Sequence, residues 1–422
     1  MNTHVDYSRV WIGLDDTDSP DSGCTTATFD DLIREISQLK DLIIIERRLV
    51  RLWPFAERRT RGNGALACVL DCPVSLISNL EELLANFFNN LLMELNINED
   101  SLTSPALLYS FKELEENLYW DAVRHKVDLS FRRQSLDDVK ILSHTDSDWG
   151  IIGASSAMSW QPSEDSTWEL IAWRFSDKIG TKRQFSSSLI RDLESFHPDT
   201  FVNRDPTADK GLIAPRTPCP VLYGIRGSSS KAVLLAHEWL QSQSDVEKSE
   251  RYAIHRTNQL SDDHILGFLF GTVLTKPVET QGGHSSLEVF SQGRNVTLVA
   301  FKEGGNVNRL LRKLIPGDRI NWLGLESPDG SIHLERLSIE SSLPRITGRP
   351  ICCNGKTMRS SGSNQPLRCL TCQKNLEKHW LFQEIDFNGV EIINNWVEPP
   401  ASQRRHLSRP LAFGAPISYV DK

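Results

Sequence analysis

Carboxylates and hydroxyls gather directly after an apolar run near the start of the chain. Residues 10–14 are apolar, and the polar positions that follow closely are Asp15, Asp16, Asp18, Gly23, Thr25 and Thr26. Mg²⁺ prefers oxygen ligands, and proteins usually bind it through one or two carboxylates together with the phosphates of a substrate. We therefore expect a strand that ends in a phosphate-handling site, with Asp15 and Asp16 as ligands of Mg²⁺.

The same stretch also has a purely structural interpretation. Asp-rich turns after strands are common, and Asp and Thr cap helices. Thr25 precedes residues 29–36, where apolar residues recur at helical spacing, so Thr25 also fits a helix N-cap. The two roles are compatible because a helix N-terminus favours anions. The residues alone do not rank Thr25 above the adjacent Thr26.

A second polar turn stands ahead of a strand expected over residues 65–70. It consists of Arg61, Gly62, Asn63 and Gly64. Paired glycines let backbone N–H groups approach a phosphate closely, and the preceding Arg58 and Arg59 add positive charge. Asn-Gly is also a hairpin signal, so this turn alone is weak evidence for a nucleotide site.

Residues 217–227 contain Cys219 between two prolines, which stiffen the backbone there. No histidine stands at a spacing that indicates a base for a nucleophilic thiol. A small buried side chain is therefore the better interpretation of Cys219. Tyr223 in the same segment fits either a core aromatic or the wall of a pocket for a cation.

Half of the cysteines cluster near the C-terminus, within about twenty residues. In a reducing compartment this grouping indicates a metal before a disulfide. Cys369 and Cys372 form the CxxC turn of a zinc ribbon, whereas Cys352 and Cys353 are adjacent. Because neighbouring side chains do not easily converge on one tetrahedral ion, we expect only one of that pair to bind, and take Cys353 with Cys369 and Cys372 as zinc ligands. Completion of the site by His379 and loss of the metal both remain open.

The composition describes a folded protein of several domains. The chain has 422 residues, 39% of them hydrophobic and 24% charged, enough for about two to four domains. No apolar run approaches the length of a membrane span, and the N-terminus lacks the features of a signal peptide. We therefore expect a cytoplasmic location and no membrane partner.

The net charge of −8 argues against a nonspecific nucleic-acid binder, which would usually be basic. It is compatible with an RNA enzyme that carries one local basic patch. Arg404 and Arg405, close to Trp396 and two prolines, form such a patch, and we take them as candidate RNA contacts. An ordinary solvated surface is the alternative.

The elements expected over residues 1–145 and 146–248 alternate between strands and helices, which indicates α/β or α+β domains. In the first segment we expect strands near residues 10–14, 42–46 and 65–70, and helices after residue 25 and near 78–94. In the second we expect a glycine turn opening a helix at 150–157, strands at 168–175 and 221–225, and a helix at 231–243. That order suits a ferredoxin-like sheet.

The segment 264–341 predicts a β-barrel. Strands are expected at residues 265–274, 287–291, 296–301, 320–325 and 332–339, with a helix at 306–314. Three strands, a helix and two strands is the order of the OB-fold, which commonly binds single-stranded nucleic acid. A barrel that serves only as a spacer is the alternative. The last segment, 342–422, holds the cysteine cluster and the basic tail.

Four ordered blocks of the sequence, at residues 11–26, 59–64, 217–227 and 397–407, resemble the archaeal 2-agmatinylcytidine synthetase family, which modifies an isoleucine tRNA. The blocks span nearly the whole chain. The resemblance implies an α+β multidomain protein: an ATP-binding α/β kinase-like domain, a ferredoxin-like domain with the agmatine pocket, an OB-fold RNA-binding domain and a zinc-ribbon-like module.

The resemblance also implies residue roles. Asp15, Asp16 and Asp18 would organise metal and phosphates, and Thr25 would be the residue that can become phosphorylated. The turn at residues 61–64 would bind the nucleotide. Gly153, Cys219 and Tyr223 would border the agmatine pocket.

We therefore expect an enzyme that uses ATP and Mg²⁺ to attach agmatine to C2 of the wobble cytidine (position 34) in the CAU anticodon of an isoleucine tRNA. The C2 oxygen is a poor leaving group, and its phosphorylation would let the amine of agmatine displace phosphate. Zn²⁺ would be structural, and no obligatory protein partner is expected. The alternatives are a non-catalytic OB-fold and zinc-ribbon RNA-binding protein, which would not need three carboxylates at one strand end, and a kinase or ligase for a small molecule.

Overall fold

The structure is a computed structural model that describes residues 5–18, 23–59, 62–97, 101, 103–145, 148–183 and 185–418. The chain forms two compact units. The first comprises Met1–Leu266 and Pro400–Pro410, and the second comprises Gly267–Pro399 and Leu411–Lys422. The short segment Pro400–Pro410 thus returns to the first unit after the chain has built the second.

The first unit is built on one nine-stranded sheet, with the strand order β5-β4-β1-β3-β2-β11-β6-β10-β7. Its strands are β1 Tyr7–Asp15, β2 Ile43–Arg51, β3 Gly64–Pro73, β4 Ala106–Ser110, β5 Lys140–Ser143, β6 Thr167–Trp173, β7 Thr200–Phe201, β10 Val221–Gly227 and β11 Arg251–Thr257. A separate pair is formed by β8 Arg204–Asp205 and β9 Lys210–Gly211. The expected strands at 10–14, 42–46, 65–70, 168–175 and 221–225 are present, and the second runs on through Arg47, Arg48 and Arg51.

The sheet consists of two halves with the same topology. In the first, β1 and β2 are linked by α1 (Thr25–Ile36) and β3 and β4 by α2 (Ile77–Leu95), with the strand order β4-β1-β3-β2. In the second, β6 and β7 are linked by α6 (Ser187–Phe196) and β10 and β11 by α7 (Ser230–Ser242), with the order β11-β6-β10-β7. Parallel pairing of β2 with β11, through Arg48↔Arg256 and Leu49↔Thr257, joins the halves.

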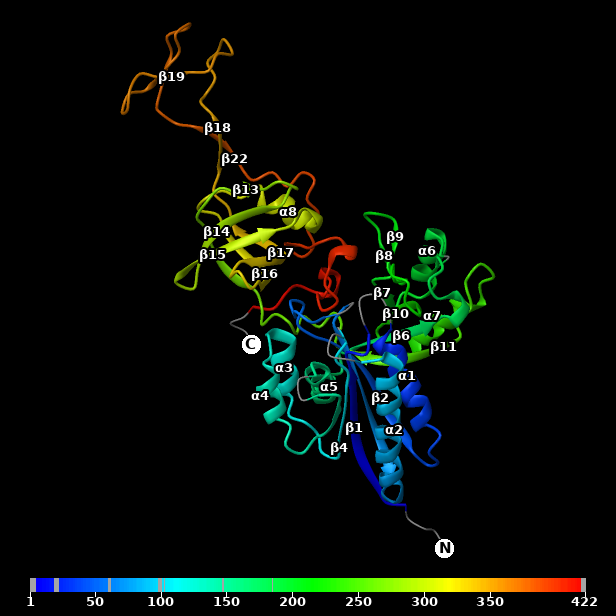
Figure 1. The fold of residues 1–422 in the computed structure, drawn as a ribbon. Helices are drawn as coiled ribbons and strands as arrows, with labels where there is room; N and C mark the ends of the chain where they lie inside the picture. The colour runs from blue at the N-terminus through cyan, green and yellow to red at the C-terminus, as the bar shows by residue number, and fades with distance from the viewer. Residues whose placement is uncertain are drawn as a thin grey trace. The chain divides into compact units, whose positions relative to one another are not determined.

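Helices cover both faces of the first half (Figure 1). On one face α1 and α2 bury the apolar stripes that their sequences predicted, including Phe29, Leu32 and Leu84, against β1 and β3. On the other face lie α3 (Asn117–Arg124), α4 (Leu129–Gln134) and α5 (Gly150–Ser159). The expected glycine turn at residues 150–157 is itself part of helix α5. In the second half α6 and α7 share a core with β6 and β10.

The second unit contains a closed barrel of five strands. They are β12 Leu269–Val273, β14 Ser285–Ser291, β15 Arg294–Ala300, β16 Arg319–Glu326 and β17 Ile332–Ser341. The barrel closes because β12 pairs with both β14 and β16, and β15 pairs in parallel with β17. Alternate residues of β14 point inward, as the period of a strand requires. Helix α8 (Asn306–Leu311) lies between the third and fourth strands, and β13 (Val278–Glu279) and β23 (Trp396–Val397) pair at the margin.

The cysteine-rich part of the second unit has only short strands. They are β18 Arg345–Gly348, β19 Arg359–Ser360, β20 Leu367–Arg368, β21 Asn375–Leu376 and β22 Leu381–Gln383. β19, β20 and β21 form a three-stranded sheet, and β18 pairs with β22. Across the part of the chain that the structure describes, no helix is long and apolar enough to cross a membrane.

Candidate active site

Two carboxylates stand at the end of β1, where the sequence predicted them. Asp15 is the last residue of the strand and Asp16 follows it with φ of 60°, a left-handed conformation that is strained for a residue other than glycine. Oδ2 of Asp16 accepts a hydrogen bond from the backbone N–H of Ser104, at 3.1 Å. This contact holds the carboxylate in place, so the strain serves to position a charged group.

Glycines in α5 make room for Asp15. A methyl group at Gly153 would lie 1.7 Å from Oδ2 of Asp15, and one at Gly150 would lie 2.8 Å from the Asp15 carbonyl oxygen. Gly13 on β1 is equally restricted, because a methyl group there would lie 2.5 Å from the carbonyl oxygen of Ala154. The helix therefore packs directly on the strand, and the carboxylate of Asp15 occupies the space that a side chain at position 153 would fill.

Burial and mutual repulsion make these carboxyl groups hard to ionise. Burial raises the pKa of Asp15 well above its usual value, and the neighbouring Asp16 and Asp18 raise it further. Burial also raises the pKa of Asp16 to about 7, and the charge of Asp18 contributes to this rise. The hydrogen bond from the Ser104 N–H and the charge of Arg58 lower the same pKa and partly offset the rise. A bound cation would reverse these shifts, and carboxylate oxygens are the donors that Mg²⁺ prefers.

Thr25 is held against a third carboxylate. Its Oγ1 donates a hydrogen bond to Oδ1 of Asp18 at 2.8 Å, and both side chains are buried. The N-cap interpretation of Thr25 is wrong, because Cys24 occupies the N-cap position and Thr25 is the first residue of α1. Thr26 differs from Thr25, since its hydroxyl contacts the Cys24 sulfur at 3.0 Å.

The glycine turn ahead of β3 lies beside the same carboxylates. Gly62 and Asn63 have φ of 76° and 42°, and the side-chain amide of Asn63 donates to the Trp53 carbonyl oxygen at 2.9 Å. Arg61, predicted to bind the nucleotide, lies outside the described residues. The other predicted members of the turn are Gly62, Asn63 and Gly64, and of these Asn63 and Gly64 line a pocket with Asp15 and Asp16.

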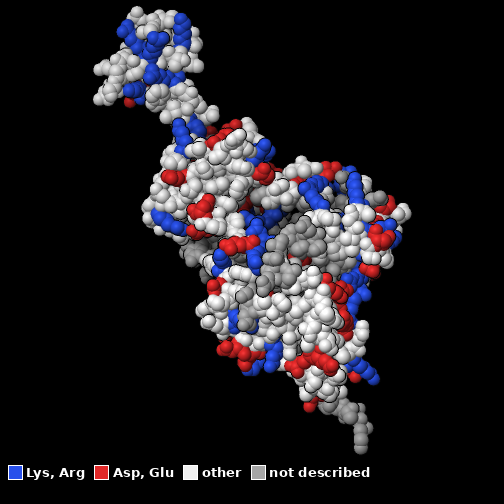
Figure 2. Space-filling view, in the orientation of Figure 1, with Lys and Arg blue, Asp and Glu red and all other residues white. Residues whose placement is uncertain are grey.

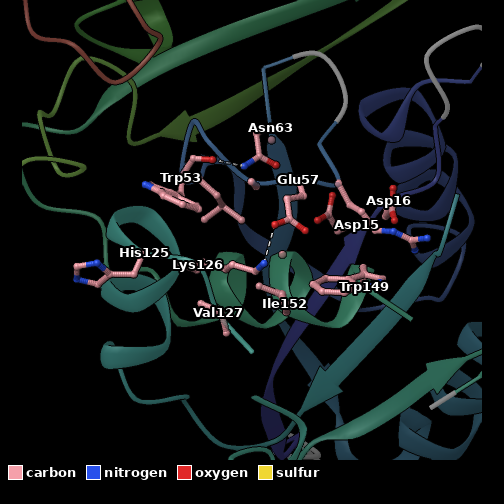
Figure 3. Close-up of a pocket in the computed structure, with 16 residues that line it drawn as sticks. Asp15, Asp16, Trp53, Glu57, Asn63, His125, Lys126, Val127, Trp149 and Ile152 are labelled. Carbon is pink, nitrogen blue, oxygen red and sulfur yellow. Dashed lines mark hydrogen bonds and ion pairs between the residues drawn. The ribbon is translucent and has the colours of Figure 1, made fainter. Parts of the chain in front are cut away.

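Figure 3 shows that pocket, whose open space including its mouth is about 750 Å³. One side carries Asp15, Asp16 and Asn63. The remaining walls are aromatic, aliphatic and charged: Leu52, Trp53, Ala56, Glu57, Arg58, Ala122, His125, Lys126, Val127, Trp149 and Ile152. Lys126 and Glu57 form an ion pair at 2.7 Å. Of these wall residues the sequence interpretation named only Arg58. The others come from the loop after β2, from α3 and the loop after it, and from the start of α5, and no local motif marks them.

The residues expected around agmatine do not form one pocket. Gly153 lines the pocket of Asp15, whereas Cys219 and Tyr223 are buried elsewhere in the first unit. Tyr223 is fully buried, and its hydroxyl contacts Nδ1 of His237 at 2.8 Å, so its ring is a core aromatic and does not face an open site. Cys219 is a buried thiol that contacts the Arg183 guanidinium at 3.4 Å, in keeping with the small buried side chain that the residues indicated.

The cysteine cluster differs from the expected ligand set in one residue. The sulfur atoms of Cys352, Cys369 and Cys372 lie within 4.8 Å of one another, whereas Cys353 is exposed. Backbone N–H groups of Cys372 and Thr371 point at the Cys369 sulfur and lower the pKa of that thiol. Within the described chain His379 does not join this group; it is exposed, and its Nδ1 contacts the Glu377 carbonyl oxygen.

The basic tail folds onto the first unit. Leu407 is buried in the core beneath α5, and the backbone N–H of Leu260 bonds the carbonyl oxygen of His406. The guanidinium of Arg405 lies 4.9 Å from the ring centre of Phe55, and both Arg404 and Arg405 are half-buried. Arg405 therefore lies next to the loop that carries Trp53 and Arg58.

The site has the parts of a phosphoryl-transfer centre: carboxylates at a strand end, a hydroxyl held by a third carboxylate, and an aromatic-walled pocket beside a glycine turn. In the same chain a closed barrel and a three-cysteine cluster accompany it. The class is therefore that of multidomain α+β proteins with a carboxylate-lined pocket suited to phosphate chemistry.

Comparison with known proteins identifies the family. Models described as the TiaS TCKD domain and the TiaS FLD domain match residues 11–73 and 148–264. TiaS of Archaeoglobus fulgidus, a tRNA 2-agmatinylcytidine synthetase, is 32% identical, with coverage of 96% of this chain and 97% of the relative. The protein of the same name from Methanocaldococcus jannaschii is 31% identical, with coverage of 95% and 98%. The chain belongs to the TiaS family of 2-agmatinylcytidine synthetases, which act on an isoleucine tRNA.

Solved structures agree with this assignment. A complex of TiaS with its isoleucine tRNA and ATP is similar with a TM-score of 0.84 at 30% identity, covering 97% of this chain and 98% of that one. A complex of TiaS with the same tRNA, AMPCPP and agmatine is similar with a TM-score of 0.80 at 28% identity, covering 96% and 97%. The family and the mixed α+β architecture that the sequence blocks indicated are confirmed.

Proposed function

We propose that this protein is an ATP-dependent ligase that attaches agmatine to C2 of the wobble cytidine in the CAU anticodon of an isoleucine tRNA. The main observation behind this proposal is that the carboxylate of Asp15 packs into the space left by Gly153. This packing supports a carboxylate site at the end of β1, and a kinase needs such a site to hold Mg²⁺ and phosphate. Phosphorylation of the C2 oxygen turns it into a leaving group, and the amine of agmatine then displaces phosphate. A protein that only bound RNA would have no use for buried carboxylates facing a phosphate backbone.

ATP would occupy the pocket of Figure 3. The indole rings of Trp53 and Trp149 offer flat apolar walls for a base, while Lys126 and Arg58 offer positive charge to phosphates. Asp15 and Asp16 suit Mg²⁺, which would neutralise phosphate charge when bound. Thr25, hydrogen-bonded to Asp18, is the hydroxyl that we propose becomes phosphorylated.

The other parts of the chain suit tRNA and metal binding. We take residues 1–145 as the kinase-like domain, 146–248 as the ferredoxin-like domain, 264–341 as an OB-fold and 342–422 as a zinc-ribbon-like module with a basic tail. The strand order β11-β6-β10-β7 supports a ferredoxin-like half, and the closed barrel supports an OB-fold. Cys352, Cys369 and Cys372 provide thiolates for Zn²⁺.

Positive charge gathers on the segment that carries the cysteines, as the Lys and Arg side chains of Figure 2 illustrate. Between Arg345 and Gln383 there are seven basic residues and one acidic residue, Glu377: Arg345, Arg349, Lys356, Arg359, Arg368, Lys374 and Lys378. The rest of the chain is acidic on balance, so this concentration favours a phosphate backbone as partner. A tRNA substrate also supports the cytoplasmic location that the sequence predicted.

Mass spectrometry of the anticodon loop tests the activity. Purified protein, ATP, Mg²⁺, agmatine and an isoleucine tRNA with a CAU anticodon should yield a wobble cytidine heavier by agmatine minus water. Omission of ATP and replacement of the wobble cytidine by uridine should each abolish the product. Binding of the tRNA without any modification, under conditions where ATP also binds, would favour the non-catalytic alternative.

A further inference from the structure

A cluster of charged side chains lies at the junction of the two half-sheets, outside the pocket just described. Glu169 on β6 is buried and stands between two arginines. Nη2 of Arg51, at the end of β2, lies 3.5 Å from one carboxylate oxygen, and Nη2 of Arg226, on β10, lies 3.4 Å from the other. The cluster thus contains two cations and one anion, and both ion pairs are long.

Within the described residues, these two arginines make few close hydrogen bonds. Arg51 donates to the Gly62 carbonyl oxygen at a long 3.3 Å, and its buried Nε has no partner among the residues that the structure describes. Arg226 donates from Nε to Oε1 of Gln259 at 2.9 Å. A guanidinium carries a planar fork of N–H donors, so each retains unused donors in a place where water is largely excluded. Burial and the charge of Arg226 act together to lower the pKa of Arg51, although Glu169 opposes them.

Two arginines with structural roles, Arg174 and Arg48, are bonded more closely. Arg174 makes two contacts of 2.7 Å with Glu247 and two more, at 2.8 and 2.9 Å, with Thr181. Arg48 contacts Glu46 at 2.6 Å and two backbone carbonyl oxygens at 2.6 and 2.9 Å. Measured against these, Arg51 and Arg226 are under-bonded, which a purely structural role does not explain.

The cluster lies directly behind the glycine turn of the nucleotide pocket. Methyl groups at Gly62 and Gly64 would lie 2.6 and 2.7 Å from Nη1 of Arg51, so both glycines are needed for the guanidinium to pass. Asn63 and Gly64 also line the pocket of Asp15. The turn therefore separates the nucleotide from the arginines by the thickness of one backbone.

The tail brings an imidazole to the open side of the cluster. Nδ1 of His406 lies 3.1 Å from Oε1 of Gln259, and Nε2 lies 3.2 Å from the point where a Gly62 methyl would be. Gln259 accepts from Arg226 through this oxygen and donates to Glu169 through its amide nitrogen, so Nδ1 of His406 must carry the proton. His406 is an exposed residue, and the side chains of Arg51 and Arg226 each remain 12% exposed, so the two guanidiniums are not fully enclosed.

We propose that Arg51 and Arg226 form a binding site for a phosphate ester, adjacent to the nucleotide pocket. The inference rests on the proposed function, because that reaction places a phosphoryl group on the substrate next to ATP. Planar guanidiniums match phosphate oxygens in pairs, and the cluster carries a net positive charge. The phosphate could come from two sources: the phosphoryl group transferred to the cytidine, or a phosphodiester of the anticodon loop.

Binding of inorganic phosphate tests the site itself. Titration calorimetry at constant ionic strength should give a dissociation constant that rises at least about tenfold in Arg226→Gln, the range expected for loss of one charge-assisted hydrogen-bonding group. Glu169→Gln removes the competing anion and should lower the dissociation constant for phosphate several-fold. This change is opposite in direction to that of Arg226→Gln, and loss of a purely structural ion pair would not produce it. Arg9→Gln, at the far end of β1, is the matched control and should bind like wild type. Equal phosphate binding in wild type, Arg226→Gln and Glu169→Gln would overturn the proposal.

Two activity measurements separate the sources. We expect Arg226→Lys, which keeps the charge opposite Glu169 but loses the planar fork, to bind tRNA like wild type and to modify it at least about a hundredfold more slowly at saturating tRNA. Weaker tRNA binding with an unchanged rate at saturation would assign the site to a backbone phosphodiester. If tRNA binding and the rate of modification are both unchanged in Arg226→Lys while wild type modifies tRNA, the proposed phosphate site is wrong and the proposed function stands. If wild type makes no product, the proposed function fails instead. Because Arg226→Lys retains the ion pair with Glu169, it can replace Arg226→Gln in the phosphate titration if Arg226→Gln does not fold.

Discussion

Replacement of Gly153 by alanine tests whether the packing of α5 against β1 builds the nucleotide site. The added methyl would lie 1.7 Å from Oδ2 and 2.5 Å from Cγ of Asp15, so either the carboxylate or the helix must move. Alanine is the better helix former by about 1 kcal/mol, whereas overpacking typically costs about 1–3 kcal/mol. We expect a net loss of stability of up to about 2 kcal/mol, the difference between these two effects.

The same substitution should disable the site. A displaced Asp15 no longer shares a cation with Asp16, so Mg²⁺–ATP affinity should fall by at least about tenfold, which corresponds to about 1.4 kcal/mol. Titration calorimetry with ATP and Mg²⁺ measures the affinity, and urea unfolding measures the stability. Gly304→Ala is a matched control, because its methyl would meet only Cβ of Val307, at 3.9 Å.

A double variant separates the clash from other effects. Gly153→Ala combined with Asp15→Ala removes the carboxylate that the methyl would strike. The double variant should therefore lose less stability than the sum of the losses of the two single variants. It should still fail to bind ATP, because Asp15 is absent. Wild-type stability together with wild-type ATP affinity in Gly153→Ala would refute the packing argument.

Three further predictions concern single groups. Because the pKa of Asp16 is raised to about 7, metal-free protein should lose stability as pH rises from about 4 to about 7. Asp16→Asn should flatten this pH dependence of stability, measured by urea unfolding in EDTA, and should abolish ATP turnover. An unchanged pH dependence in Asp16→Asn would contradict the raised pKa of Asp16. Thr25→Val should remove the phosphate found by peptide mapping after incubation with ATP, whereas label on Thr26 alone would show the wrong residue was chosen. Cys352→Ser should lose zinc in elemental analysis while Cys353→Ser keeps it, and equal loss in both variants would speak against a single ligand from this pair.

The regular elements of the first unit were predictable because their apolar patterns are local. The stripe of α1 and the apolar run of β1 each specify one buried face, and the structure uses both. The barrel strands were predictable for the same reason, since alternation along β14 continues through the whole strand. The carboxylates of the site were also within reach, because Asp15 and Asp16 follow the apolar run of β1 directly.

The pocket walls could not be predicted, because they meet only through tertiary packing. Trp53, Lys126 and Trp149 stand far apart in the sequence and are brought together when α5 docks on β1. The packing of Gly153 against Asp15 could not be predicted either, since Asp15 lies more than a hundred positions away in the sequence. Tyr223 was ambiguous because an aromatic residue on a half-buried strand has the same pattern in a core as in a pocket wall.

The two half-sheets show that topology does not determine the chemistry here. Both have the strand order 4-1-3-2, so the end of β6 corresponds to the end of β1. After β1 the chain places Asp16, which is strained and half-buried, whereas after β6 it places Arg174, which is saturated by Glu247 and Thr181. Asp16 lines the pocket of Figure 3, whereas the guanidinium of Arg174 is taken up by its contacts with Glu247 and Thr181. The helix α5 and the tail through His406 are added around the first half and the junction, so we argue that these additions, and not the repeated sheet, made a catalytic site from a common scaffold.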